Sequence, residues 1–259
     1  MKIHFSKYQG AGNDFVMLDN RDGKYNDLTI AQIQFICDRK FGVGADGLIK
    51  INAHPTLDFE ADYYNADGSK SFCGNGGRCA VSFAKKLDFI GNSVNFLGFD
   101  GPHKATIELD KVQLEMNDVN SIIVHENDFE LYTGSPHYIR FQTNLADFDI
   151  FNYGQSIRYN ETYNSEGINV NAVEVLATNQ LYVRTYERGV ENETLACGTG
   201  VTASAIAYAY KENRIGDSSI KVKVQGGDLE VQFSYDGKSF SNVWLIGPGT
   251  FVFEGSIDD

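Results

Sequence analysis

The chain has few of the features that mark secreted, membrane or zinc-binding proteins. Its 259 residues include only 4 cysteines, 4 prolines and 1 tryptophan. No Cys-x-x-Cys pair is present and the 5 histidines are scattered, so we expect no metal site. The first residues lack the apolar run of a signal peptide, and no stretch reaches the roughly 20 apolar residues that span a bilayer. We therefore expect a cytoplasmic protein whose cysteines are reduced thiols.

The chain also has fewer basic than acidic residues. Lys and Arg together number 22 against 35 Asp and Glu, which gives a formal net charge of −13. A polyanion of this size repels phosphate backbones and anionic headgroups, so neither nucleic acid nor a membrane surface is an expected partner. Apolar residues make up 42% of the chain, enough for a large core, and the length allows one large domain or two of ordinary size.

Two short glycine-rich motifs, about half the chain apart, resemble each other. Cys73-Gly74-Asn75-Gly76 and Cys197-Gly198-Thr199-Gly200 each place a cysteine directly before glycines. The segments that follow, Gly77–Leu87 and Val201–Lys211, have helical spacing and are apolar on nearly every face. This pattern is typical of a helix that is buried on all sides, and it predicts one such helix in each half of the chain.

Most of the remaining periodicity is that of short strands. A further helix is expected over Thr29–Arg39, with Thr29 as its N-cap. Apolar alternation bounded by turn residues predicts strands over 3–8, 15–19, 48–51, 58–64, 105–109, 112–116, 172–177, 180–186, 220–224, 229–235, 239–246 and 251–254. We therefore predict an α+β fold of two similar domains. Each would be a mostly antiparallel sheet or barrel wrapped round a buried central helix, with the active site in the cleft between the domains.

The two cysteine motifs suggest a particular chemistry. A cysteine at a helix N-terminus is biased toward the thiolate, because unpaired N–H groups and the helix dipole favour negative charge there. The glycines also let those N–H groups approach a ligand carboxylate. If Cys73 and Cys197 face one another across a single carbon, a thiolate can remove its proton while a thiol protonates the opposite face. Such a pair inverts the carbon without a cofactor or metal.

Other interpretations of these residues carry less weight. Cysteines are commonly buried for structural reasons, and we interpret Cys37 and Cys79 in this way because both lie in apolar helical patterns. The glycines after Cys73 are not followed by the Lys-Ser/Thr of a phosphate-binding loop. His137 could be the general base of a thiol protease, although a lone histidine after a proline is more often structural.

Taken together, the motifs resemble those of diaminopimelate epimerase. The matching segments cover nearly the whole chain: Asn13-Asp14-Phe15, Asn65-Ala66-Asp67-Gly68, both cysteine motifs, Gly134 with Pro136-His137, Gly167-Ile168-Asn169-Val170, Glu187-Arg188-Gly189, Glu193-Thr194, Gly247-Pro248 and Phe251–Gly255. The resemblance implies a cofactor-independent isomerase that interconverts LL- and meso-2,6-diaminopimelate in lysine and peptidoglycan precursor synthesis, and a homodimer. It also implies that the last strand returns to the first domain. That domain would span 1–113 plus 248–259 and carry Cys73, and the second would span 114–247 and carry Cys197.

The same resemblance implies which residues carry out the reaction. Cys73 and Cys197 would be the acid–base pair. His137 and Glu187 would lie next to the cysteines and tune them. Backbone N–H groups of Gly74, Asn75, Gly198 and Thr199 would hold the reacting carboxylate.

The distal end of the substrate, with its own ammonium and carboxylate, would be bound by polar side chains: Asn13, Asn65, Asn169, Glu187 and Arg188. An acidic partner, a bidentate arginine and neutral amides are what such a zwitterionic end requires. Gly47 and Ser135 stand where some family members have a glutamine and an asparagine that touch substrate. A glycine makes no side-chain contact, whereas Ser135 could make a shorter one.

Four other functions are alternatives to this one. A proline or hydroxyproline racemase would also use two cysteines but has no need of the distal Glu-Arg-Asn set, and a phenazine-biosynthesis-type isomerase lacks the cysteine pair. From a different class, a thiol redox protein would use Cys73 and Cys197 as a disulfide switch. A binding module without catalysis has little to support it when both cysteines are present.

Overall fold

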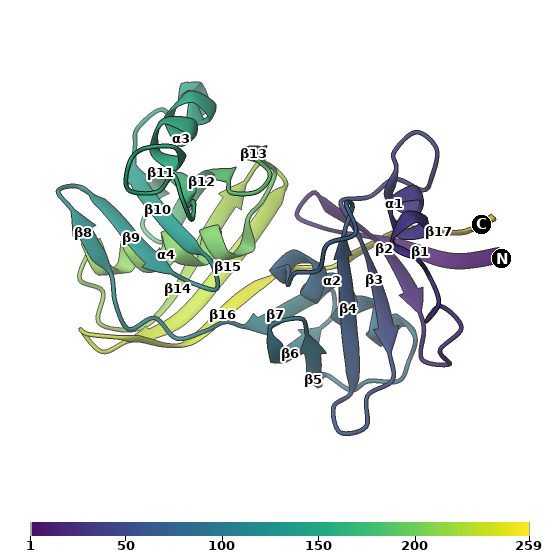
Figure 1. The fold of residues 1–259 in the computed structure, drawn as a ribbon. Helices are drawn as coiled ribbons and strands as arrows, with labels where there is room; N and C mark the ends of the chain where they lie inside the picture. Colours follow the sequence, from purple (N-terminus) through teal and green to yellow (C-terminus); the bar gives the residue numbers. More distant parts are fainter. Residues whose placement is uncertain (1, 259) are drawn as a thin grey trace. The chain divides into compact units, whose positions relative to one another are not determined.

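The computed structural model describes residues 2–258, which form two compact units. Unit 1 combines the described parts of Met1–Leu114 and Gly247–Asp259, and unit 2 is Glu115–Ile246. In Figure 1 the purple and blue strands belong to unit 1, together with the yellow C-terminal strand β17, which lies beside the N-terminal strand β1. Unit 1 is therefore built from both ends of the chain, whereas unit 2 is one continuous segment.

Unit 1 contains one sheet whose strands pair in a fixed order. From one edge to the other they are β17 (Thr250–Asp258), β1 (Lys2–Gly10), β2 (Asn13–Asp19), β3 (Gly47–Asn52), β4 (Phe59–Asn65), β5 (Ser93–Gly98), β6 (Gly101–Glu108) and β7 (Lys111–Glu115). The pairs β2–β3 and β4–β5 are parallel, and the other pairs are antiparallel. Parallel neighbours need a crossover connection, and a helix fills each of these two gaps in the chain.

Unit 2 repeats this order. Its strands are β8 (Ile123–His125), β9 (Asp128–Tyr132), β10 (Pro136–Phe141), β11 (Asn169–Ala177), β12 (Gln180–Glu187), β14 (Gly216–Val224), β15 (Gly227–Tyr235) and β16 (Phe240–Pro248). The pairs β10–β11 and β12–β14 are parallel, at the same places in the order as in unit 1. The short strand β13 (Asn192–Thr194) pairs with the end of β12. The two halves of the chain are therefore a structural repeat.

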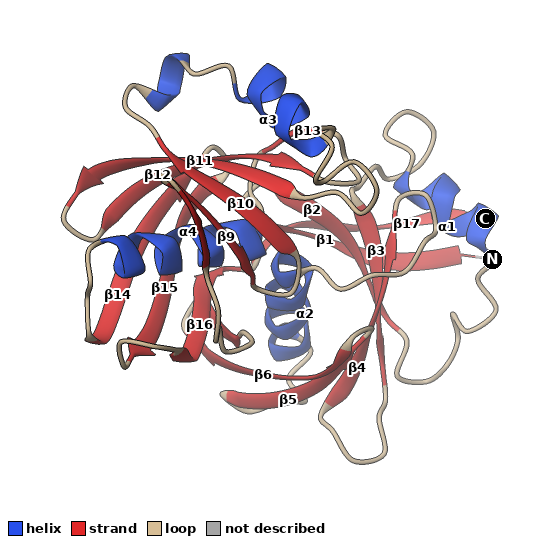
Figure 2. Cartoon of the chain, turned by 60° about the vertical axis from the view of Figure 1, so that its left-hand side comes forward, coloured by secondary structure: helices blue, strands red, loops and turns tan. Residues whose placement is uncertain are grey.

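The helices occupy matching places in the two units. In unit 1, α1 (Ile30–Cys37) leads from β2 to β3 and α2 (Gly74–Lys86) from β4 to β5. In unit 2, a short 3₁₀ helix (Leu145–Asp147) and α3 (Ile150–Arg158) lead from β10 to β11, and α4 (Gly198–Lys211) leads from β13 to β14. Figure 2 shows α4 enclosed by strands of its own unit, and all its residues except Thr199, Tyr210 and Lys211 are buried. The helices α2 and α4 are the buried central helices.

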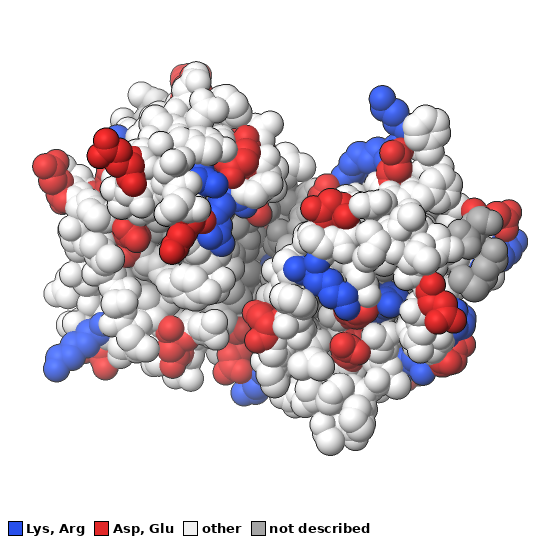
Figure 3. Space-filling model, in the orientation of Figure 1, with Lys and Arg blue, Asp and Glu red and all other residues white. Residues whose placement is uncertain are grey.

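The surface carries the excess of acidic residues. On the face drawn in Figure 3, red Asp and Glu side chains are spread over both units, with blue Lys and Arg side chains scattered among them. Within residues 2–258, no helix has the length and apolar character needed to cross a membrane.

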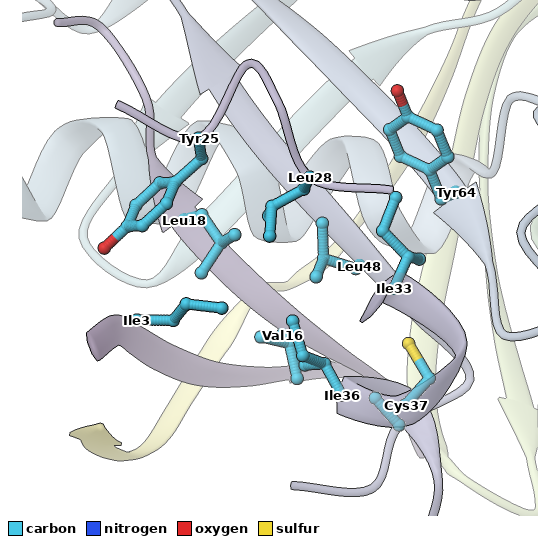
Figure 4. Close-up of a cluster of buried hydrophobic side chains, with 11 residues drawn as sticks. Ile3, Val16, Leu18, Tyr25, Leu28, Ile33, Ile36, Cys37, Leu48 and Tyr64 are labelled. Atoms are coloured by element: carbon cyan, nitrogen blue, oxygen red, sulfur yellow. The ribbon is translucent and has the colours of Figure 1, made fainter. Parts of the chain in front are cut away.

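Helix α1 packs on unit 1 through a separate apolar cluster. Figure 4 shows Ile33, Ile36 and Cys37 of the helix beside Val16 and Leu48 of the neighbouring strands. All five side chains are at most 3% exposed. Thr29 accepts a hydrogen bond from the backbone N–H of the third helical residue and is the N-cap of the helix, as the sequence predicts.

The predicted fold class is confirmed, but the predictions differ from the structure at the helices α2, α3 and α4. The helices expected over Gly77–Leu87 and Val201–Lys211 both begin three residues earlier. The glycines favour a loop in the sequence pattern, because glycine loses more conformational freedom in a helix than any other residue, but here they form the first turn of each helix. Helix α3 was not predicted, because only Ile150 and Gly154 are buried and its apolar stripe is weak.

Candidate functional site

Each central helix begins directly after a cysteine. Cys73 is the N-cap of α2, with φ −130° and ψ 117°, and Cys197 is the N-cap of α4, with φ −119° and ψ 109°. Both residues are extended, which places each sulfur at the positive end of a helix. Cys73 is half-buried, and Cys197 is 7% exposed. Both sulfurs are therefore placed where a thiolate is stabilised.

The other two cysteines have a different environment. Burial raises the pKa of Cys37 and that of Cys79 to about 12. Cys37 lies in the cluster of Figure 4, and Cys79 lies in the middle of α2 with no exposed surface. Both remain protonated thiols at neutral pH, in agreement with a structural role.

In unit 1 the sulfur of Cys73 contacts an asparagine from the start of β2. Its Sγ lies 3.3 Å from Oδ1 of Asn13, and Nδ2 of Asn75 donates to the same oxygen at 3.4 Å. The amide nitrogen of Asn13 donates to a carboxylate oxygen of Asp46 at 2.6 Å. Because a carboxylate only accepts, Asp46 fixes the orientation of this amide and turns its oxygen toward Cys73.

A buried arginine lies behind this group. Arg78 is fully buried in the second turn of α2, and its Nη2 donates to Oδ1 of Asn75 at 2.9 Å. Its Nε donates to the carbonyl of Pro248 at 3.4 Å, while Nη1 has no partner among the described residues. Burial lowers the pKa of Arg78. Arg78 therefore supports the side chain of Asn75 from the same helix.

Asn65, at the end of β4, is held within its own turn. Its Oδ1 accepts from the Tyr63 hydroxyl at 2.8 Å, and its Nδ2 donates to the hydroxyls of Ser69 and Ser71 at 3.0 and 3.1 Å. Gly68, with φ +84°, provides the left-handed residue that this tight turn needs. The amide is therefore positioned by local structure before any ligand is bound.

In unit 2 a buried histidine leads to Cys197 through a threonine. His137, at the start of β10, is fully buried, and its Nε2 lies 2.9 Å from Oγ1 of Thr199. The same hydroxyl lies 3.5 Å from the sulfur of Cys197. Burial, aided by the positive charge of Arg188, lowers the pKa of His137 to about 3, so the ring is neutral at pH 7. Thr199 therefore bridges His137 and Cys197 through its side chain.

Two further residues hold the histidine. Nδ2 of Asn171 donates to Nδ1 of His137 at 3.0 Å and to the carbonyl of Tyr138 at 3.2 Å. Oδ1 of Asn171 accepts from the Thr185 hydroxyl at 2.9 Å. Neither Asn171 nor Thr185 was predicted as a site residue from the sequence. An asparagine two residues after Asn169 in a strand shares its face of the sheet, and that alternation was the available signal.

Three predicted binding residues of unit 2 form a second cluster. The amide of Asn169 donates to Oγ of Ser135 at 2.8 Å, and its oxygen accepts from the backbone N–H of Arg188 at 2.9 Å. The guanidinium of Arg188 is exposed and reaches the Glu166 carbonyl at 2.9 Å and Ser135 at 3.4 Å. Glu187 accepts from the hydroxyl of Thr194 at 2.8 Å. Ser135 thus joins this set through its hydroxyl.

The residues fall into two half-sites, one in each unit. Unit 1 brings Asn13 and Asn75 to Cys73, with Asn65 held in the nearby turn after β4. Unit 2 brings Thr199 and His137 to Cys197, and groups the residues around Arg188. Among residues 2–258, no three or more His, Cys, Asp and Glu side chains are gathered where they could hold a metal ion. The chemistry available in each half-site is that of a thiol at a helix N-terminus.

The sequence comparisons point to one family. A sequence model of diaminopimelate epimerase matches residues 5–122 and 129–252. The diaminopimelate epimerase of Flavobacterium psychrophilum is 49% identical over 259 residues, which cover 99% of this chain and 100% of that protein. The diaminopimelate epimerase of Chlorobaculum tepidum is 38% identical, with 96% and 98% covered.

Solved structures share the fold at low sequence identity. A phenazine biosynthesis protein of the PhzF family from Bacillus anthracis is similar with a TM-score of 0.76 at 12% identity, over 100% of both chains. A probable proline racemase from Agrobacterium radiobacter is similar with a TM-score of 0.70 at 15% identity, over 99% of this chain and 93% of that one. These likenesses support the two-domain α+β architecture and nothing finer.

Proposed function

The chain belongs to the diaminopimelate epimerase family, and on this premise we propose that it interconverts LL- and meso-2,6-diaminopimelate. The enzyme is an isomerase that uses two cysteines and no cofactor. Family membership favours this reaction over that of a proline racemase or a thiol redox protein. The product serves lysine and peptidoglycan precursor synthesis.

One observation carries the mechanism. Cys73 and Cys197 are the N-caps of the central helices α2 and α4. In each unit this helix leads into the second strand of the second parallel pair, so the two cysteines occupy equivalent places in the structural repeat. We assign the domains as 1–113 with 248–259 and 114–247, so that each contributes one sulfur. The repeat provides two alike groups for the two faces of one carbon, which is what inversion requires.

The reaction then consists of two proton transfers. The thiolate of one cysteine takes the α-proton, and the electron pair of the broken C–H bond moves toward the substrate carboxylate. The thiol of the other cysteine gives its proton to the opposite face of the carbon. The first sulfur ends as a thiol and the second as a thiolate, so the reverse reaction uses the same groups in exchanged roles.

Backbone N–H groups stabilise the carbanion. Those of Gly74, Asn75, Gly198 and Thr199 lie in the first turns of α2 and α4, which have N–H groups to spare. Hydrogen bonds from helix N-termini to the reacting carboxylate become stronger as negative charge develops on it, and this lowers the barrier.

Polar side chains select the distal end of the substrate. Asn13, Asn65, Asn169, Glu187 and Arg188 bind its ammonium and carboxylate. The exposed guanidinium of Arg188, steadied by Ser135 and the Glu166 carbonyl, supports the assignment of the distal carboxylate to it. Glu187 is the anionic partner for the ammonium, and together with His137 it tunes the cysteines.

We further propose that the enzyme is a cytoplasmic homodimer. Reactive thiols need a reducing compartment. Among the described residues β17 pairs with β1 only, and its Phe251, Val252 and Phe253 are 41%, 51% and 45% exposed. An apolar edge strand that pairs with its own copy about a two-fold axis covers both edges at once.

Proton NMR of the reduced protein with LL-diaminopimelate in D2O tests the function. We expect the α-proton signal to disappear while the meso isomer accumulates. Absence of exchange with this substrate, together with exchange of the α-proton of proline, would overturn the assignment in favour of a proline racemase.

A further inference from the structure

The direction of two hydrogen bonds differs between the two half-sites. In unit 1 the carboxylate of Asp46 accepts from the amide nitrogen of Asn13, so the oxygen of Asn13 faces Cys73. A carbonyl oxygen cannot donate a proton, and it repels a thiolate. The contact at 3.3 Å is therefore favourable only when Cys73 is a thiol that donates its S–H.

In unit 2 the chain of hydrogen bonds runs toward the sulfur. The Tyr138 carbonyl only accepts, so the amide nitrogen of Asn171 faces Nδ1 of His137 and leaves that nitrogen without a proton. The neutral ring then carries its proton on Nε2 and donates it to Thr199. Since the oxygen of Thr199 accepts from His137, its own proton is available for Cys197, 3.5 Å away.

We infer that in the resting enzyme the shared proton resides on Cys73, while Cys197 is the thiolate. Asn171 is the positioning residue that maintains this state, because it fixes the tautomer of His137 and thereby the direction of the Thr199 hydroxyl. The Asn171 relay is the hydrogen-bonded set of Thr185, Asn171, His137 and Thr199.

Both half-sites contain charged groups of both signs. Around Cys73 lie the Arg78 guanidinium and the Asp46 carboxylate, which is itself paired with Arg39 at 2.7 Å. In unit 2, Arg188 acts electrostatically on His137, and Glu187 is the carboxylate at the end of β12. Each half-site thus contains a helix N-terminus, at least one arginine and at least one carboxylate. The direction of the hydrogen bonds is what differs.

This placement rests on the proposed function and deepens it. A Cys197 thiolate takes the α-proton of the isomer whose C–H bond faces it, and the Cys73 thiol protonates the other face. After that turnover the proton is on Cys197 and the thiolate on Cys73. The enzyme must then exchange protons with water to return to its resting state, whereas the other isomer can react at once.

Residue-specific alkylation tests the placement without any substrate. The reduced protein is treated with iodoacetamide from pH 5 to pH 10, and each modified cysteine is quantified by peptide mass spectrometry. The single variants Cys73→Ser and Cys197→Ser are titrated in parallel, so that each thiol is also measured without the other. We expect the rate at Cys197 to reach half its maximum at least about one pH unit below that of Cys73, a tenfold difference in thiolate fraction. Equal midpoints or the reverse order would overturn the inference.

Asn171→Asp tests the relay itself. A carboxylate at this place only accepts, so it draws the His137 proton to Nδ1 and leaves Nε2 to accept from Thr199. We expect the ¹⁵N signals of His137 to change from the Nε2–H to the Nδ1–H tautomer. The alkylation midpoint of Cys197 should rise by about one pH unit, and that of Cys73 should stay unchanged.

The uncharged variant Asn171→Leu separates the lost hydrogen bond from the added charge, and it should raise the Cys197 midpoint in the same direction. An unchanged tautomer in Asn171→Asp, or an unchanged midpoint in both variants, would contradict the relay. If the wild type epimerises but the two midpoints are reversed, only the placement fails. If the midpoints are as expected but no epimerisation occurs, only the function fails.

Discussion

In both units the strands beside the central helix pair in the same way, so positions can be matched one to one. Where the first parallel strand pair begins, Phe15 pairs with Gly47 in unit 1 and His137 with Asn169 in unit 2. Two residues further on, Ile49 is opposite Tyr63, and Asn171 is opposite Thr185. Unit 1 thus has Phe15, Ile49 and Tyr63 where unit 2 has His137, Asn171 and Thr185. The same frame carries packing residues in one unit and the relay in the other.

The glycines of the two cysteine motifs explain how these strand side chains fit against the central helices. A Cβ on Gly200 would lie 2.4 Å from Oδ1 of Asn171, and one on Gly76 would lie 3.1 Å from the Ile49 side chain. Each helix therefore needs a glycine three residues after its cysteine, so that the matching side chain can approach. The motif reflects close packing in both units, and the chemistry of the neighbours is what distinguishes them.

The largest effect is expected when the sulfur of either unit is removed. Cys73→Ser and Cys197→Ser should each reduce epimerisation by about 10³-fold, since a serine is a far weaker acid and base than cysteine. Isomer interconversion followed in D2O measures this, with circular dichroism to verify the fold. Cys37→Ala is the matched control, with unchanged activity and a stability loss of about 1 kcal/mol. Full activity in either serine variant would contradict the two-thiol mechanism.

The second largest effect should be that of acid, which should lower the stability of unit 2 at a higher pH than that of unit 1. The pKa of His137 is lowered from 6.5 to about 3, so the unfolded chain binds a proton below pH 6.5 and the native unit 2 does not. Its contribution is present above pH 6.5 and is lost as the pH falls toward 3, by about 1.4 kcal/mol per unit. Burial alone would raise the pKa of Asp14 in unit 1, but hydrogen bonds from Arg39 and Lys7 outweigh it and lower the pKa from 3.8 to about 2. That contribution is lost only below about pH 4.

Hydrogen exchange with mass spectrometry at pH 6.5 and 4.5 measures the difference. After correction for intrinsic rates, protection of β10–β12 should fall about 100-fold, and that of β1–β3 should fall far less. His137→Gln should abolish the excess sensitivity of unit 2. Equal losses in the two units would show that His137 is not the responsible group.

Substitution of Arg188 should have a smaller effect, on substrate binding. Its counterpart in unit 1, directly after the matching strand, is Ala66, so only unit 2 has a cation at this place. Arg188→Ala should raise KM by about 10-fold or more with little change in kcat, because a charge-assisted contact to the distal carboxylate is worth about 1.5–3 kcal/mol. Arg188→Lys should fall between the two, since it keeps the charge without the fork. An unchanged KM in the alanine variant would count against this role.

The smallest expected effect is the difference in stability between the variants Thr185→Val and Tyr63→Phe. The first leaves the buried Oδ1 of Asn171 without its hydroxyl donor and should lower stability by about 1–3 kcal/mol, with activity reduced about threefold. The second removes a donor to the half-buried Asn65 and should cost less than about 1 kcal/mol. Thermal unfolding and steady-state rates of both variants measure this. A larger loss in Tyr63→Phe would reverse the comparison.

Much of the architecture follows from the sequence pattern. The α+β class, the two buried helices and the Thr29 cap were predicted correctly, because apolar periodicity and capping residues act locally. Helix α3 was missed because it lies on the surface with few buried residues. The early helix starts were missed because glycine favours loops in isolation.

The sequence by itself determined the family, the two cysteine motifs and their repetition, since these depend on residue types at short spacing. Only the tertiary structure decided which side chains surround each sulfur. Asp46 lies 33 residues from Asn13, and Asn171 lies 34 from His137, and strand pairing brings each pair into contact. The direction of a hydrogen bond depends on which partner can only accept, and that is set by such long-range contacts. Two nearly identical motifs therefore hold their sulfurs in different surroundings.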